Sequence, residues 1–133
     1  MQSKYIIDIV TPDNLDEFVN LVKDYIKVSD IVCLEGELGA GKTTFVKAFL
    51  KSYNFYNVSS PTFSIINEYK LKDFDVLHAD FYRVENVKSF VDYIKEKQSE
   101  SITFVEWPKE IECTKTLSIK DVGKNRRLFK LCL

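Results

Sequence analysis

The chain has 133 residues, 45% of them apolar, which is enough for one domain built around one hydrophobic core. A formal net charge of −1 supplies no basic surface for nucleic acid or for a membrane, so we expect no strong direct binding to either. No apolar run approaches the ~18 residues of a membrane-spanning helix.

The three cysteines, Cys33, Cys113 and Cys132, are odd in number and form no Cys-x-x-Cys pair. The amino terminus is too polar for a signal peptide. Together these features predict reduced thiols in a cytoplasmic protein.

The first half of the chain alternates predicted strands and helices. Residues 4–10 form a β-branched run that predicts a strand. Thr11 with Pro12, or Asp13, begins a predicted helix whose apolar residues recur at helical spacing: Leu15, Phe18, Val19, Val22, Tyr25 and Ile26. Four consecutive apolar residues, 31–34, are typical of a strand covered on both faces. A second helix follows, with an inner face of Phe45, Ala48, Phe49 and Tyr53.

The second half begins with two strands, 64–70 and 76–82, whose short polar connection favours antiparallel pairing. A short helix with Val87, Phe90, Val91 and Ile94 follows, then a buried strand at 102–107. The end of the chain reads as two strands around residues 123–125. Alternating strands and helices indicate an α/β fold with a mainly parallel sheet.

Three of the four glycines lie in the stretch LEGELGAGKTTF, residues 34–45. Gly36-x-x-x-x-Gly41-Lys42-Thr43 follows a predicted strand and opens a predicted helix, as a phosphate-binding loop requires. Backbone N–H groups can wrap a polyphosphate there, Lys42 can reach its terminal phosphates, and the Thr43 hydroxyl can bind Mg²⁺. The alternative is a glycine turn that only joins strand to helix, but four fixed positions match by chance in well under ~1% of chains this long.

A phosphate-binding loop also needs a carboxylate near the magnesium. Asp80 and Glu106 each end an apolar run, and the residues alone leave both open. His78 shares a face with Asp80; a buried, hydrogen-bonded histidine is favoured there over a catalytic one. The stretch SSPTF, residues 59–63, is either an ordinary Ser-Pro turn or a loop that senses the γ-phosphate.

These pieces, in the order GELGAGKTTF, SSPTF, HADFYR and VEWP, resemble the bacterial TsaE family, the small P-loop ATPases of tRNA threonylcarbamoyladenosine (t6A) synthesis. The resemblance runs from about residue 5 to the end of the chain. It implies a single three-layer P-loop NTPase-like domain over residues 1–133, with a seven-stranded, mostly parallel sheet and antiparallel strands at its edges. It also implies ATP, Mg²⁺ and a complex with TsaD and TsaB homologues, through which the protein meets tRNA only indirectly.

Carried over by position, the resemblance places Thr43 and Glu106 on the magnesium and Asp80, Lys42 and Thr62 in catalytic roles. It places the phosphates on a run of eight residues: Glu37, Leu38, Gly39, Ala40, Gly41, Lys42, Thr43 and Thr44. Further matches are a first switch loop of Ser60, Pro61 and Thr62, a second of Asp80, Tyr82 and Arg83, a Trp107 at the nucleotide or partner contact, and Arg127 at the nucleotide. The segment after Arg83 departs from the family in being shorter and free of glycine.

Three other functions compete with this interpretation. A small kinase would use the same loop, but the chain shows no Arg-rich lid. A GTPase would need an Asn-Lys-x-Asp run, which the sequence lacks. The third is a nucleotide-dependent clamp subunit, which would bind ATP with the same residues but would not hydrolyse it; a turnover assay separates it from an ATPase.

Overall fold

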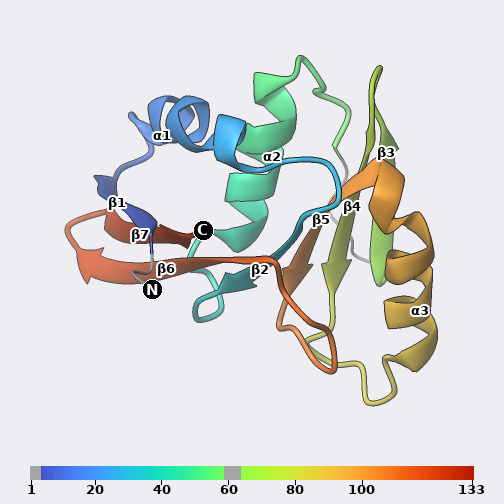
Figure 1. Ribbon diagram of the computed structural model, residues 1–133. Helices are drawn as coiled ribbons and strands as arrows, with labels where there is room; N and C mark the ends of the chain where they lie inside the picture. The colour runs from blue at the N-terminus through green and yellow to red at the C-terminus, as the bar shows by residue number, and fades with distance from the viewer. Residues whose placement is uncertain (1–3, 59–63) are drawn as a thin grey trace.

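The computed structural model describes residues 4–58 and 64–133. The predicted first switch loop, with Ser60, Pro61 and Thr62, therefore lies outside the described residues. Seven strands form one sheet in the order β1-β7-β6-β2-β5-β4-β3 (Figure 1). Their bounds are Tyr5–Val10 for β1, Ile31–Glu35 for β2, Ile66–Lys70 for β3, Asp75–Asp80 for β4, Ser101–Glu106 for β5, Lys115–Gly123 for β6 and Arg126–Cys132 for β7.

The centre of the sheet is parallel and its edges are antiparallel. β4, β5, β2 and β6 run in the same direction, whereas β3 pairs antiparallel with β4, and β7 pairs antiparallel with both β6 and β1. Short connections join the antiparallel pairs β3–β4 and β6–β7, as the sequence predicted. The expected α/β fold with antiparallel edges is confirmed.

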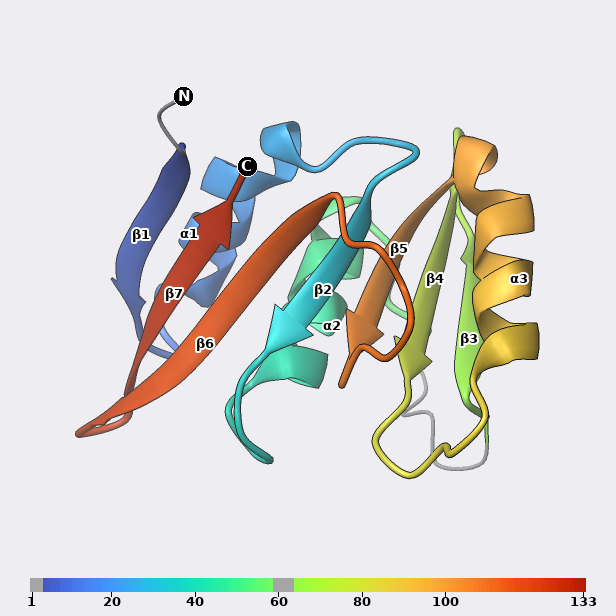
Figure 2. The same cartoon turned by 60° about the horizontal axis from the view of Figure 1, so that its bottom comes forward.

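Helices cover both faces of the sheet, giving three layers (Figures 1 and 2). α1 (Leu15–Val22) and α2 (Lys42–Ser52) pack on one face, and α3 (Lys88–Lys97) packs on the other. The central strand β2 serves both cores by alternation: Val32 and Leu34 join the α1–α2 side, and Ile31 and Cys33 join the α3 side. No helix within the described ranges is long and apolar enough to cross a bilayer.

The first helix is shorter than its apolar spacing predicted. α1 ends at Val22, and a 3₁₀ turn follows over Lys23–Tyr25. The tighter turn changes the angular spacing, so Tyr25 faces solvent whereas Ile26 remains buried. Tyr25 is thus not part of the core.

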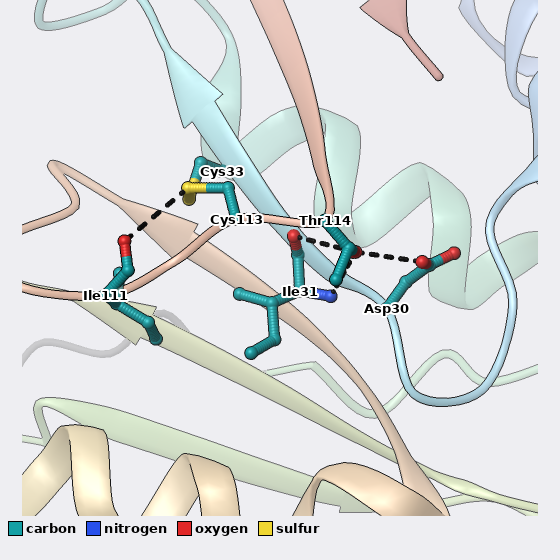
Figure 3. The surroundings of a disulfide bond; sticks show 6 residues. All are labelled: Asp30, Ile31, Cys33, Ile111, Cys113 and Thr114. Atoms are coloured by element: carbon teal, nitrogen blue, oxygen red, sulfur yellow. Dashed lines mark hydrogen bonds between the residues drawn. A yellow bond between two sulfur atoms is a disulfide. The ribbon is translucent and has the colours of Figure 1, made fainter.

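The connection between β5 and β6, residues 107–114, crosses the α3-side face of the sheet without a helix (Figure 2). Ile111 and Cys113 pack into the core on that face. There Cys113 forms a disulfide with Cys33 of β2, with a Cα–Cα distance of 5.7 Å (Figure 3). The prediction of three reduced thiols is therefore wrong for this pair and holds only for Cys132. The cysteines lie 80 positions apart, and only the crossing of β2 by this connection brings them together.

Two polar contacts fasten the end of the same connection. The Thr114 hydroxyl donates to Asp30 Oδ1 at 2.8 Å, and Lys115 Nζ lies 2.6 Å from Asp30 Oδ2 (Figure 3 draws the first). The Thr114 backbone N–H also donates to the Ile31 carbonyl at 2.8 Å. These bonds align the starts of β2 and β6, so that the end of β2 lies beside Ser118 of β6 and the glycine-rich loop follows directly beside Ile119.

Candidate nucleotide site

The glycine-rich loop joins the end of β2 to the start of α2, and its glycines meet two different steric demands. A Cβ on Gly36 would lie 2.7 Å from the Ile119 carbonyl oxygen of β6, so no larger residue fits there. Gly41, the residue before α2, has φ +115°, which L side chains rarely adopt. The loop therefore packs against β6 at one end and turns sharply into the helix at the other.

Lys42 is the first residue of α2, and its side chain folds back into the loop. Its Nζ donates to the Gly36 carbonyl at 2.7 Å and lies 3.8 Å from the centre of the Trp107 ring. Burial lowers the pKa of Lys42, while the charges of Glu106 and Asp80 act in the opposite direction. The site thus holds a desolvated cation next to two carboxylates.

Thr43 and Glu106 meet beneath the loop. The Thr43 hydroxyl donates to Glu106 Oε2 at 2.8 Å, and His78 Nε2 lies 2.5 Å from the same oxygen. Glu106 ends β5, next to β2, and Thr43 lies in the first turn of α2. Burial alone would raise the pKa of Glu106, but the bonds from His78 and Thr43 and the charge of Lys42 together lower it below its ordinary value. Glu106 is therefore ionised at neutral pH.

A hydroxyl and a carboxylate in contact at a helix N-terminus suit Mg²⁺ that arrives with a nucleotide. Magnesium is commonly bound through one or two carboxylates plus substrate phosphates. Within residues 4–58 and 64–133, no group of three or more His, Cys, Asp or Glu side chains could hold a metal by itself. The donor set of Thr43 and Glu106 therefore fits a metal whose remaining ligands are phosphate oxygens and water.

Asp80 ends β4 directly opposite Glu106 in the parallel register of β4 and β5. Its Oδ1 accepts a hydrogen bond from the Tyr82 backbone N–H at 3.0 Å, which forms a tight turn after the strand. The two carboxylates that the sequence left open thus lie at the same edge of the sheet, but the contact of Thr43 is with Glu106. Asp80 lies one strand further from the loop.

A cavity of about 300 Å³ lies on the other side of the loop, toward β1 and β7. It is lined by loop and helix residues Gly39, Ala40, Gly41 and Thr44 and by Thr11, Leu15, Arg127 and Phe129, among others. Arg127 Nε donates to the Ala40 carbonyl at 3.2 Å, and its guanidinium lies 3.4 Å from Asp121 Oδ1. The sequence-predicted contact residue Arg127 is therefore beside the loop.

Two features of the site were missed by sequence reasoning. The Trp107 ring packs on the Tyr82 ring, with centroids 4.9 Å apart, and also covers Lys42. Trp107 has a positive φ of 53°, and this turn after β5 aims its ring back at the loop. The second feature is the contact of His78 with Glu106: the predicted hydrogen bond is present, but nothing in the spacing of residues 78 and 106 identifies the partner.

The comparisons with known proteins agree on one family. Residues 9–128 match the family model described as "Threonylcarbamoyl adenosine biosynthesis protein TsaE". The chain is 39% identical over 114 residues to the tRNA threonylcarbamoyladenosine biosynthesis protein TsaE of Aquifex aeolicus, covering 83% of this chain and 82% of that protein. It is 31% identical to the protein of the same name from Rickettsia typhi, covering 86% and 85%. The crystal structure of Bacillus subtilis YdiB matches with a TM-score of 0.72 at 26% identity, covering 99% of this chain and 87% of that one.

Proposed function

Because the chain belongs to the TsaE family, we propose that it is the ATP-binding and ATP-hydrolysing subunit required for t6A modification of tRNA, at the adenosine next to the anticodon. The observation that carries this proposal is the bond from the Thr43 hydroxyl to Glu106 Oε2 at 2.8 Å. It joins the glycine-rich loop to a buried carboxylate across 63 positions of sequence. A glycine turn that only connected β2 to α2 would need no such partner.

We assign the magnesium to Thr43 and Glu106. When bound, Mg²⁺ neutralises charge that develops on the phosphate oxygens during transfer to water. The ionised Glu106 offers the negative charge that a divalent cation requires. The Thr43 hydroxyl donates its hydrogen bond to Oε2, and its oxygen would still have lone pairs to offer a metal.

We assign the phosphates to Lys42 and to the backbone N–H groups of residues 37–44. Lys42 is a buried cation at a helix N-terminus, so its interaction with a phosphate anion is only weakly screened by water.

Asp80 is proposed to act on the attacking water or the γ-phosphate from the edge of β4, together with Thr62 of the first switch loop. We place the adenine base in the cavity beside Arg127, since that cavity opens next to Gly39 and Thr44 and is largely apolar.

We further propose that homologues of TsaD and TsaB are the partners, and that tRNA is met through them. Tyr82 is exposed at the site edge, next to Trp107, and is a suitable contact for such a partner.

A tRNA-modifying assembly works where tRNA is found, so we place the protein in the cytoplasm. Disulfides are rare in reducing compartments, and the complete burial of Cys33 restricts the access of a reductant to its sulfur.

Steady-state ATP turnover by the purified chain, with and without TsaD and TsaB homologues, tests activity and partnership together. We expect slow turnover alone, below ~1 per second, and faster turnover in the complex, because the sequence shows no Arg-rich lid that would exclude water from the site. A pull-down with a non-hydrolysable ATP analogue, with ADP and with no nucleotide should show capture that depends on the nucleotide. Tight ATP binding without turnover in any mixture would support the clamp, and phosphoryl transfer to a metabolite would support the kinase.

A further inference from the structure

His78 is a buried polar residue for which the proposed reaction has no role so far. It lies on β4 with 1% of its surface exposed, and its neighbours on the same face of the sheet, Val76 and Phe104, are apolar. A leucine would fill such a position without any polar group to satisfy. The imidazole must therefore be explained by what it contacts, which is Glu106.

The contact identifies the donor. A carboxylate must be deprotonated to bind a metal, and a deprotonated carboxylate only accepts hydrogen bonds. His78 therefore carries a proton on Nε2 and donates it to Oε2. The Thr43 hydroxyl donates to the same oxygen, so two donors from two elements, β4 and α2, converge on one atom.

Two donors on one oxygen fix the plane of the carboxylate. A glutamate side chain turns easily about its last bond, because that torsion has no sharp minima. With Oε2 held from β4 and from α2, rotation would break two short bonds in a buried site. Oε1, which takes part in neither bond, is then held in one direction.

We infer that His78 is a positioning residue for the metal site, which orients Glu106 so that its carboxylate is ready to bind magnesium. The inference rests on the proposed nucleotide function, since it needs a metal that Glu106 binds. It assigns His78 no contact with nucleotide or metal. Hydrogen bonds to metal-binding carboxylates typically change metal affinity 10- to 100-fold, which sets the size of effect to expect.

The test measures nucleotide binding by calorimetry across a magnesium series and in EDTA, with a non-hydrolysable ATP analogue as the probe. His78→Leu keeps the approximate size of the side chain but removes the donor. Its magnesium midpoint, the Mg²⁺ concentration that gives half of the magnesium-dependent gain in nucleotide affinity, should rise about 10- to 100-fold. Binding in EDTA should stay as in the wild type. His78→Gln places an amide N–H near the position of Nε2 and should recover most of that loss. The recovery separates hydrogen bonding from packing.

Val76→Ala is the matched control. Val76 lies on the same strand and face, is fully buried and pairs with Ile102, four positions before Glu106 on β5. This variant should melt at a lower temperature, because it leaves a cavity, but keep the wild-type magnesium midpoint. If His78→Leu fails to fold, His78→Asn replaces it: its amide lies near the Nδ1 position and should not reach Oε2.

A wild-type midpoint in His78→Leu or His78→Asn would overturn the inference. So would an equal loss in the Leu and Gln variants that persists in EDTA, since this is the pattern of a packing residue. A wild-type protein that binds no nucleotide under either condition would refute the proposed function, and the positioning role with it. Wild-type binding that depends on magnesium but not on residue 78 would refute the positioning role alone.

Discussion

The side chains of Thr43 and Glu106 meet at 2.8 Å, although 63 positions separate them in the chain. The contact exists because β2 and β5 are adjacent and parallel, so the loop after β2 and the last residue of β5 reach the same edge of the sheet. β4 is the other parallel neighbour of β5, and this second pairing places Asp80 opposite Glu106. Because Thr43 contacts Glu106, and Asp80 lies on the next strand, the roles of the two carboxylates can be tested separately.

Removing the hydroxyl of Thr43 should weaken magnesium-dependent binding. We expect Thr43→Ala to bind nucleotide in EDTA as the wild type does and to lose most of the gain in affinity that magnesium gives. Thr43→Ser keeps the hydroxyl and is the control. The measurement is calorimetric affinity with and without Mg²⁺, and an alanine variant with a full magnesium response would remove Thr43 from the metal.

Lys42→Ala should lose nucleotide affinity in both conditions. A hydrogen bond to a charged group contributes about 1.5–3 kcal/mol, so binding should weaken roughly 10- to 150-fold. The fold should persist, because the variant also removes a buried charge whose desolvation opposes folding. Lys47, exposed on the same helix, supplies the control Lys47→Ala. Equal affinities in the two variants would contradict the phosphate role.

Substitutions of the two carboxylates, Glu106 and Asp80, should change different measured quantities. Glu106→Gln removes a metal ligand and should weaken binding in magnesium, whereas Asp80→Asn should spare binding and slow turnover by about 10²- to 10⁴-fold, the range for a lost acid–base group. Binding and single-turnover rates are measured side by side in each variant. The reverse pattern would mean that the roles are exchanged.

Asp30 should make the stability of the fold depend on pH. Burial alone would raise its pKa, but the hydrogen bonds from Lys115, Lys27 and Thr114 lower it below the usual 3.8. A lowered folded-state pKa gives stability that is present above the unfolded-state value and lost as the pH falls through the folded-state value. Asp30→Asn should therefore cost about 2 kcal/mol in urea unfolding at neutral pH and little in strong acid. A difference that did not depend on pH would show that the charge of Asp30 is unimportant.

The Cys33–Cys113 disulfide should stabilise the fold against unfolding. It closes a loop of 80 positions, for which chain-entropy reasoning gives about 4.5 kcal/mol. Urea unfolding with and without a dithiol reductant should show a difference of this order in the wild type and in Cys132→Ser. The double variant Cys33→Ala, Cys113→Ala should show none. An unchanged wild-type midpoint in reductant would contradict the prediction.

Local patterns of the sequence determined the order of the elements and the nucleotide loop. The spacing of Gly36, Gly41 and Lys42 between a strand and a helix was readable from the sequence, and the positive φ of Gly41 is a local requirement, whereas the close approach of Gly36 to Ile119 is not. The apolar run of β2 predicted burial on both faces, since alternate side chains point to opposite sides. Glu106 and Asp80 were recognised as strand-end carboxylates because each directly follows an apolar run.

Only the tertiary structure decided which of these residues touch. Strand order depends on packing between segments far apart in the chain, and it is what joins Thr43 and His78 to Glu106 rather than to Asp80. The Cys33–Cys113 bond likewise depends on the path of residues 107–114 across β2, and an odd count of three cysteines argued against any pairing. The Trp107 ring covers Lys42 only because Trp107 has a positive φ directly after β5. The neighbouring residue types do not predict this backbone turn, since the surrounding fold imposes it.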